Sequence, residues 1–130
     1  MALGWNLKTK EQTMNFETVA KAWINAFNEK NLSQLLALYA DNAEHLSPKL
    51  RQKRPETGGV IRGKNELKQW WADAFVNLPT LHYQLERLTV GKSHIFIEYT
   101  RQLEGELDLD VAEILEFENG LICHSRVYHG

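Results

Sequence analysis

The sequence predicts an α+β fold in which three helices pack on a curved, mostly antiparallel sheet, and three observations lead to this prediction. Apolar residues in the first part of the chain recur every three or four positions, which is typical of amphipathic helices. After Pro79 the apolar spacing changes to two, which is typical of strands with one buried face. Glycine-containing turns divide this second part into four runs. Helices followed by a series of strands indicate the α+β class.

The first helix is predicted to begin at Phe16. Phe16, Val19 and Trp23 fall on one stripe of a helix, and polar residues lie between them. Residues 1–14 are expected to form a partly ordered tail, and residues 15–130 are expected to form a single domain. A chain of 130 residues is long enough for one hydrophobic core and too short for two.

Two further helices are predicted before the strands. Asn31 is the expected N-cap of the second helix, with Gln34 three residues later as in a capping box. The third helix has a wide apolar face that includes Trp70 and Trp71, and it ends before Pro79. The inward-facing residues of the second helix are expected to be Leu32, Leu35, Leu36 and Tyr39.

A short strand, Ala43 to Leu46, and a loop, Ser47 to Gly59, are predicted between the second and third helices. The basic residues of this loop allow two interpretations, a solvated loop or a lid that grips an anion. They are Lys49, Arg51, Lys53 and Arg54.

Four strands are predicted after Pro79, and the last two are joined at Asn119-Gly120, a strong two-residue hairpin signal. Their expected ranges are Leu81 to Val90, Ser93 to Leu103, Leu107 to Glu118 and Leu121 to His129.

Composition argues against several classes of function. The net charge of −2 argues against binding to nucleic acid or to an anionic membrane surface, since both need a concentrated positive field. No apolar run reaches the roughly 18 residues that a membrane helix needs. The start of the chain lacks the pattern of a signal peptide. The single cysteine, Cys123, fits a reducing compartment. A cytoplasmic location is therefore expected.

The chain resembles the NTF2-like superfamily of cone-shaped α+β folds, whose members include ketosteroid isomerase, SnoaL-type polyketide cyclases and scytalone dehydratase. The resemblance extends over nearly the whole chain, from about Phe16 to Gly130. It implies a pocket between the helices and the concave face of the sheet. The segments that carry it are Ala26–Leu32, Leu38–Ala43, Ile61–Gly63 and Glu116–Ile122.

Only one of three catalytic positions of ketosteroid isomerase is kept in kind. The general-base aspartate of the isomerase precedes a proline, whereas the matching pair here is Ser47-Pro48. Its oxyanion-hole tyrosine falls at Trp23, which donates only through its indole N–H. Its second oxyanion acid falls at Glu113. The resemblance therefore implies a related pocket but not a ketosteroid isomerase.

Glu113 is the strongest candidate for chemistry. Strand alternation places it with Leu115 and Phe117 on one face, which the resemblance identifies as concave. A carboxylate flanked by Val111 and Leu115 is expected to be partly desolvated, which raises its pKa toward the range of a general acid or base. Alternatively, Arg101 on the neighbouring strand neutralises Glu113 in a structural ion pair.

Polar and aromatic residues of the neighbouring strands are candidate ligand contacts. Arg101 either binds a ligand carboxylate or phosphate through its two-pronged donor geometry or has a structural role. Tyr83 and Tyr99 either donate hydrogen bonds to a ligand carbonyl or belong to the core. The other expected ligand contacts are Trp23, Phe27, Tyr39, Ser47, Trp71 and Leu115.

His45 is the second catalytic candidate. In an extended chain its side chain points to the same side as that of Ser47, two residues later. Histidine titrates near neutrality and can act as a base; the alternative is an ordinary structural histidine. If His45 and Glu113 share one cavity, their side chains should lie within about 10 Å. His124 and His129 lie five residues apart on a strand and face opposite sides, so no metal site is expected.

These observations favour a small-molecule pocket protein of the SnoaL-like kind with no cofactor. As an enzyme, it would transfer protons through Glu113, helped by His45, while Arg101 or Tyr99 polarises a carbonyl. The alternatives are a non-catalytic binding module and a protein-interaction module. The resemblance also implies a homodimer through the convex sheet face, where the outward residues are Phe96, Glu98, Thr100, Ile114 and Glu116.

Overall fold

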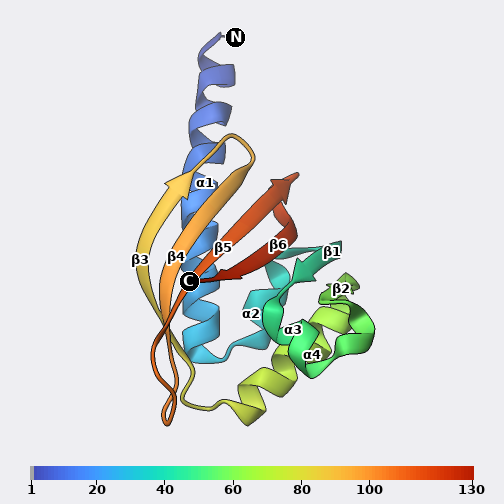
Figure 1. The fold of residues 1–130 in the computed structure, drawn as a ribbon. Helices are drawn as coiled ribbons and strands as arrows, with labels where there is room; N and C mark the ends of the chain where they lie inside the picture. Colours follow the sequence, from blue (N-terminus) through green and yellow to red (C-terminus); the bar gives the residue numbers. More distant parts are fainter. Residues whose placement is uncertain (1) are drawn as a thin grey trace.

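The computed structural model describes residues 2–130, and it describes side chains from Phe16 onward. Helices and strands follow one another in the order expected for the α+β class, which confirms that prediction (Figure 1). The elements are α1 (Ala2–Glu29), α2 (Leu32–Ala37), β1 (Tyr39–Leu46), α3 (Pro48–Lys53), the short helix η1 (Pro55–Thr57), β2 (Val60–Arg62), α4 (Gly63–Asn77), β3 (His82–Val90), β4 (His94–Gln102), β5 (Leu109–Glu118) and β6 (Leu121–His129).

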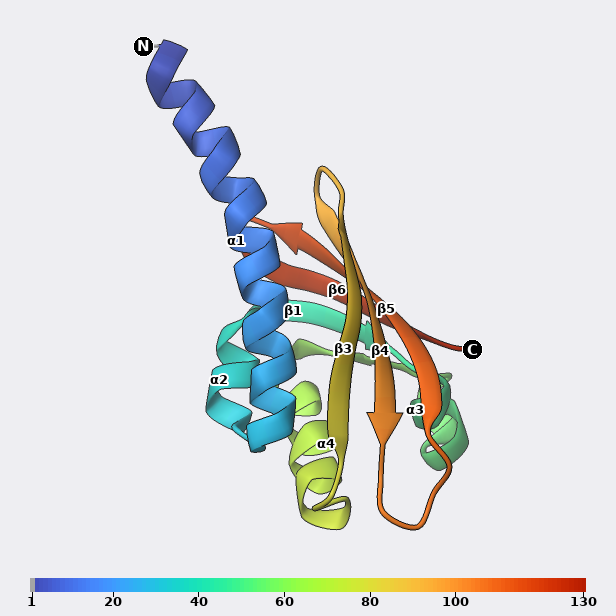
Figure 2. The ribbon, with the colours of Figure 1, turned by 90° about the vertical axis from the view of Figure 1, so that its left-hand side faces the viewer.

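The strands form one six-stranded sheet in the order β2-β1-β6-β5-β4-β3. Every neighbouring pair is antiparallel except β1 and β6, which are parallel. The predicted mostly antiparallel sheet is thus confirmed. Figure 2 shows the sheet curving beside α1, α2 and α4; α1 packs on β3 and β4, and α4 packs on β1.

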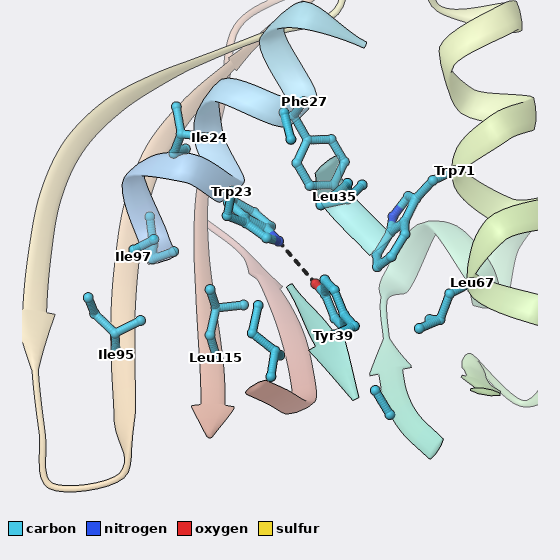
Figure 3. Close-up of a cluster of buried hydrophobic side chains, with 14 of the residues drawn as sticks. Trp23, Ile24, Phe27, Leu35, Tyr39, Leu67, Trp71, Ile95, Ile97 and Leu115 are labelled. Carbon is cyan, nitrogen blue, oxygen red and sulfur yellow. Dashed lines mark hydrogen bonds between the residues drawn. The ribbon is translucent and has the colours of Figure 1, made fainter. Parts of the chain in front are cut away.

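The core lies between α1 and the concave face of the sheet. Along β4 and β5 buried residues alternate with more exposed ones, as the period of two predicts. Figure 3 shows Trp23 of α1 directed toward Tyr39, with the indole N–H donating to the Tyr39 hydroxyl at 3.0 Å, and Phe27 of the same helix beside Leu35. The concave face is therefore mainly hydrophobic where it meets α1.

The first helix and the first strand both begin earlier than predicted. α1 starts at Ala2, so the expected tail is helical from residue 2, and residue 1 lies outside the described part of the chain. The segment contains no proline and several strong helix formers, which allows the helix to continue. The domain boundary at residue 15 stays a prediction. β1 starts at Tyr39, so the placement of Tyr39 on the second helix was wrong, because that helix ends at Ala37.

The predicted basic loop contains regular structure that the sequence analysis missed. The Ser47 hydroxyl accepts a hydrogen bond from the Lys49 amide at 3.1 Å, and Pro48 occupies the first helical position, so α3 begins here. Gly58 closes η1 with a left-handed backbone, φ +68°, which favours glycine. The Asn31 cap was predicted correctly: its side chain accepts from the Gln34 amide at 3.0 Å.

Between residues 2 and 130 no helix combines the length and the apolar character needed to cross a membrane.

Candidate functional site

A cavity of about 260 Å³ opens between the concave face of the sheet and helices α3 and α4. This volume is close to the lower end of the range of small-molecule sites, roughly 300–1,000 Å³. One end contains buried polar side chains from β1, β4 and β5, and the other is lined by charged residues of α3, of the position just after it, and of β4. We call these the deep end (His45, Tyr99 and Glu113) and the mouth (Lys49, Lys53, Arg54 and Arg101).

Glu113 of β5 lies at the deep end and is 2% exposed. Its Oε1 accepts a hydrogen bond from the Tyr99 hydroxyl at 3.1 Å, whereas Oε2 has no hydrogen-bond partner among the described residues. Burial raises the pKa of Glu113 to about 8, although the hydrogen bond from Tyr99 opposes this rise. The predicted inward orientation and the direction of the predicted pKa shift are both confirmed. At neutral pH the protonated carboxyl is therefore the major form.

His45 lies beside Glu113, with its Nδ1 4.0 Å from Glu113 Oε2. The predicted proximity of these two side chains is confirmed. Burial lowers the pKa of His45 to about 3, and the neighbouring His124 adds to this effect. Both groups are therefore neutral at pH 7, and the contact is not an ion pair.

A chain of hydrogen bonds fixes the orientation of the His45 ring. Trp23 Nε1 donates to the Tyr39 hydroxyl, which donates to Ser125 Oγ at 3.3 Å, and Ser125 Oγ lies 2.7 Å from His45 Nδ1. The Ser125 hydroxyl accepts from Tyr39, and among the described side chains His45 Nδ1 is the other partner within reach of its own proton. Ser125 then donates to Nδ1, and we assign the ring proton of neutral His45 to Nε2 from this network.

Ser125 is the residue of this network that the sequence analysis missed. It lies opposite His45 in the parallel register of β1 and β6 and is fully buried. In the sequence it is one serine in a predicted strand, without a motif around it. Only the pairing of β1 with β6 could have pointed to it, and the sequence does not give that pairing.

Arg101 does not pair with Glu113. Its Nη1 lies 3.0 Å from Glu106 Oε1, so the alternative of an Arg101–Glu113 ion pair was wrong. The register explains the difference, because Glu113 lies opposite Ile97 and Arg101 is four residues further along β4. At about 3.4 Å per residue this separation is about 14 Å along the strand.

Aromatic side chains form the wall between the deep end and the mouth. Phe27, Trp71 and Tyr83 line the cavity, and the rings of Tyr83 and Tyr99 lie 4.3 Å apart between centroids. Burial raises the pKa of the Tyr83 and Tyr99 hydroxyls above the ordinary range, so both remain protonated donors.

The remaining predicted contacts lie in two places. Ser47 lines the cavity, and its hydroxyl caps α3. Trp23, Tyr39 and Leu115 are fully buried in the core and are not among the residues that line the cavity. Tyr39 and Trp23 act on the site through Ser125 and His45, as the hydrogen-bond chain shows. Within the described residues, no group of three His, Cys, Asp or Glu side chains is placed to hold a metal ion.

The chain was compared with protein families and with solved structures. A family model described as a SnoaL-like domain matches residues 20–125. A SnoaL-like protein of unknown function from Burkholderia thailandensis E264 is 24% identical with a TM-score of 0.82, covering 90% of this chain and 95% of that one. No curated protein sequence matches the chain.

Two further solved structures have the same fold. A putative ketosteroid isomerase from Kribbella flavida is 17% identical with a TM-score of 0.73, covering 91% of this chain and 79% of that one. An NTF2-like protein of unknown function from Cytophaga hutchinsonii is 14% identical with a TM-score of 0.71, covering 88% of this chain and 89% of that one. At these identities the likeness shows the fold alone, and it confirms the predicted NTF2-like architecture.

Proposed function

The chain belongs to the SnoaL-like family, and from this premise we propose that it binds a small organic molecule in the cavity and transfers a proton on it without a cofactor. One observation carries the proposal. Glu113 is buried at the deep end, its Oε2 accepts no hydrogen bond from any residue whose side chain the structure describes, and a second titratable side chain, His45, is 4.0 Å away. A buried carboxyl oxygen without a hydrogen-bond partner is costly in a folded protein. A ligand that forms a hydrogen bond with Oε2 would remove this cost.

Glu113 is suited to carry the proton. Its pKa of about 8 lies near neutral pH, so both forms are accessible under ordinary conditions. In the ionised form, Oε2 takes a proton from a carbon next to a carbonyl, and the electron pair of the broken C–H bond moves toward the carbonyl oxygen. The resulting carboxyl then returns the same proton to another atom of the ligand. The net reaction is an isomerisation that consumes nothing.

His45 is suited to stabilise the oxygen that gains charge. The hydrogen bond from Ser125 to Nδ1 leaves the proton on Nε2, so neutral His45 can donate to a ligand oxygen. A neutral donor avoids placing a full positive charge beside the ionised form of Glu113, which would lower its pKa and weaken it as a base. The aromatic wall supplies apolar contact for the rest of the ligand.

A direct test is the exchange of carbon-bound protons in deuterated water. The protein is incubated with indanone and with other small enolisable ketones, and loss of the α-proton signal is followed by NMR. Exchange above the buffer rate is expected, with a fall of about 100-fold or more in Glu113→Gln. Glu116→Gln, on the opposite face of the same strand, is the matched control and should exchange normally. Equal rates in Glu113→Gln and the unaltered protein would refute the role of Glu113.

A non-catalytic binding protein is the second candidate, and one observation favours it. Because burial keeps both Glu113 and His45 neutral at pH 7, a ligand can be held by hydrogen bonds alone. Saturable binding of the ketones without exchange, at pH 7 and at pH 9, would favour this candidate over proton transfer.

We also propose that the chain forms a homodimer through the convex face of the sheet. Phe96 and Ile114 lie opposite each other in the register of β4 and β5, and both are partly exposed on that face. Light scattering of the purified protein tests this, and Phe96→Glu should shift a dimer toward monomer. A monomeric mass over a wide concentration range would refute it. A cytoplasmic location stays a prediction.

A further inference from the structure

The mouth of the cavity concentrates positive charge in a chain whose net charge is −2. Arg54 pairs with Glu56 at 3.2 Å. Lys49 and Lys53 of α3 also line the cavity, and neither forms a salt bridge among the described residues. Of the residues that line the cavity, only Asp73 and Glu113 are acidic, and Glu113 lies at the deep end. The mouth is therefore arranged for an anion.

Arg101 is the buried member of this group. It is 9% exposed and lines the cavity, and its single side-chain hydrogen bond among the described residues goes from Nη1 to Glu106 Oε1 at 3.0 Å. A guanidinium carries five N–H donors in a planar fork that matches a carboxylate. Most of these donors are thus not used by the protein's own side chains, and they lie at the edge of a ligand-sized cavity.

Glu106 lies close to several positive charges of the mouth. Arg101, Lys49 and Lys53 all lower the pKa of the Glu106 carboxyl. Glu106 comes from the turn between β4 and β5, where Gly105 has a φ of +87° and the Glu106 amide donates to the Leu103 carbonyl at 3.0 Å. Its side chain is 50% exposed. A carboxylate on a short exposed turn is readily solvated when it leaves Arg101, and an incoming ligand carboxylate would keep the buried guanidinium paired.

We propose that the ligand is a flat, mainly apolar molecule with a carboxylate, and that this carboxylate replaces Glu106 on Arg101 while Lys49 and Lys53 add to the attraction. The aromatic wall then contacts the apolar part, and the opposite end of the ligand reaches toward Glu113. The backbone positions of the two ends are about 14 Å apart along β4, so a ligand of about this length or shorter, reached by the side chains, would contact both. This inference rests on the proposed function for its use of the same cavity, but it does not require that a proton is transferred.

The test compares naphthoate with naphthamide, its neutral analogue, by calorimetry at low salt. We expect naphthoate to bind about tenfold more tightly to the unaltered protein. Arg101→Gln should abolish this preference. Glu106→Gln should increase it by about tenfold, because the competing carboxylate is gone, and should leave naphthamide binding unchanged. The matched controls are Arg87→Gln and Glu98→Gln, which alter an exposed ion pair of 3.7 Å on β3 and β4 outside the cavity; neither should change binding of either probe.

A second measurement does not depend on the naphthyl group fitting. The Arg101 Nε–H signal is followed by NMR while Glu106→Gln protein is titrated with benzoate and, separately, with phosphate. A saturable shift with benzoate supports the proposal. A shift with phosphate but not with benzoate would contradict the proposed carboxylate and indicate that Arg101 binds a phosphate group.

Two results would overturn the proposal. They are equal affinities for naphthoate and naphthamide, and no movement of the Arg101 signal with either anion. Failure here is distinguishable from failure of the proposed function, because the exchange of neutral indanone involves Glu113 and His45 and does not involve Arg101.

Discussion

The deep end and the mouth of the cavity use polar residues in opposite ways. At the deep end Glu113 and His45 are held on strands, are buried, and are uncharged at neutral pH. At the mouth the cations lie on a six-residue helix, at its C-cap and near the end of a strand, and Glu106 is on an exposed turn. Burial therefore dominates the chemistry of one end, and charge dominates the other. The first should respond strongly to pH, and the second should respond to salt.

The largest expected effect is the pH dependence that Glu113 gives to stability. Its pKa is raised from 4.5 to about 8, so between these values the folded protein holds a proton that the unfolded chain has released. The free energy of unfolding should therefore fall as the pH rises through this range, by an amount on the order of a few kcal/mol. Denaturant unfolding from pH 4 to pH 9 measures it. Glu113→Gln should remove this contribution, and a variant with an unchanged fall would contradict the assignment.

His45 should produce a slope of the opposite sign. Its pKa is lowered from 6.5 to about 3, so between these values the unfolded chain binds a proton that the folded protein does not. Stability should therefore rise with pH through this window and be lost on acidification, again by on the order of a few kcal/mol. Between about pH 4.5 and 6.5 the two slopes oppose each other. In His45→Gln, stability should no longer fall on acidification, and only the fall with rising pH that Glu113 causes should remain. An undiminished loss of stability at acid pH would contradict this role of His45.

A smaller effect is expected from the serine that orients His45. Ser125→Ala leaves Nδ1 of His45 without its partner, so the free energy of unfolding should fall by about 1–3 kcal/mol. NMR of the ring nitrogens should show the proton on Nε2 in the unaltered protein and a mixture of tautomers in the variant. Ser93→Ala, at an exposed serine between β3 and β4, is the control and should change neither quantity. An unaltered His45 spectrum in Ser125→Ala would mean that another contact orients the ring.

The smallest effect is expected at the mouth. Glu106→Gln should leave the denaturant midpoint of unfolding nearly unchanged, because the side chain is half exposed and the glutamine amide oxygen can still accept a hydrogen bond from Arg101. The preference for naphthoate should shrink as salt is raised, whereas indanone exchange should not change. A loss of stability comparable to that of Ser125→Ala would show that Glu106 is structural and would remove the contrast between the two ends.

Local patterns predicted the parts of the site that lie on regular strands. Alternation along β5 placed Glu113 inward, and the short strand before Ser47 brought His45 to the same cavity. The contacts that cross between distant strands could not be predicted. The contact of Ser125 with His45 requires the parallel pairing of β1 with β6. The register of β4 and β5 places Arg101 too far from Glu113 to pair with it.

The shortest helices and strands could not be predicted from the spacing of apolar residues. α3 has six residues and β2 has three, too few to show a repeat. The Ser47-Pro48 pair carried a usable helix-start signal, but it was interpreted as part of a loop. Tyr39 was placed one element too early because a helix boundary shifted by two residues changes which element contains it.

The parallel pairing of β1 with β6 has a consequence for the order of folding. The pairing joins His45 to Ser125, which are 80 positions apart in the sequence. Forming this contact closes a long loop and costs chain entropy, so we expect it to form late in folding. During synthesis β1 leaves the ribosome long before β6, and until then one edge of β1 and one edge of β5 have no neighbour. The helices and the β3–β4 hairpin can form from local contacts, whereas the deep end of the cavity is completed only when the last strand is inserted.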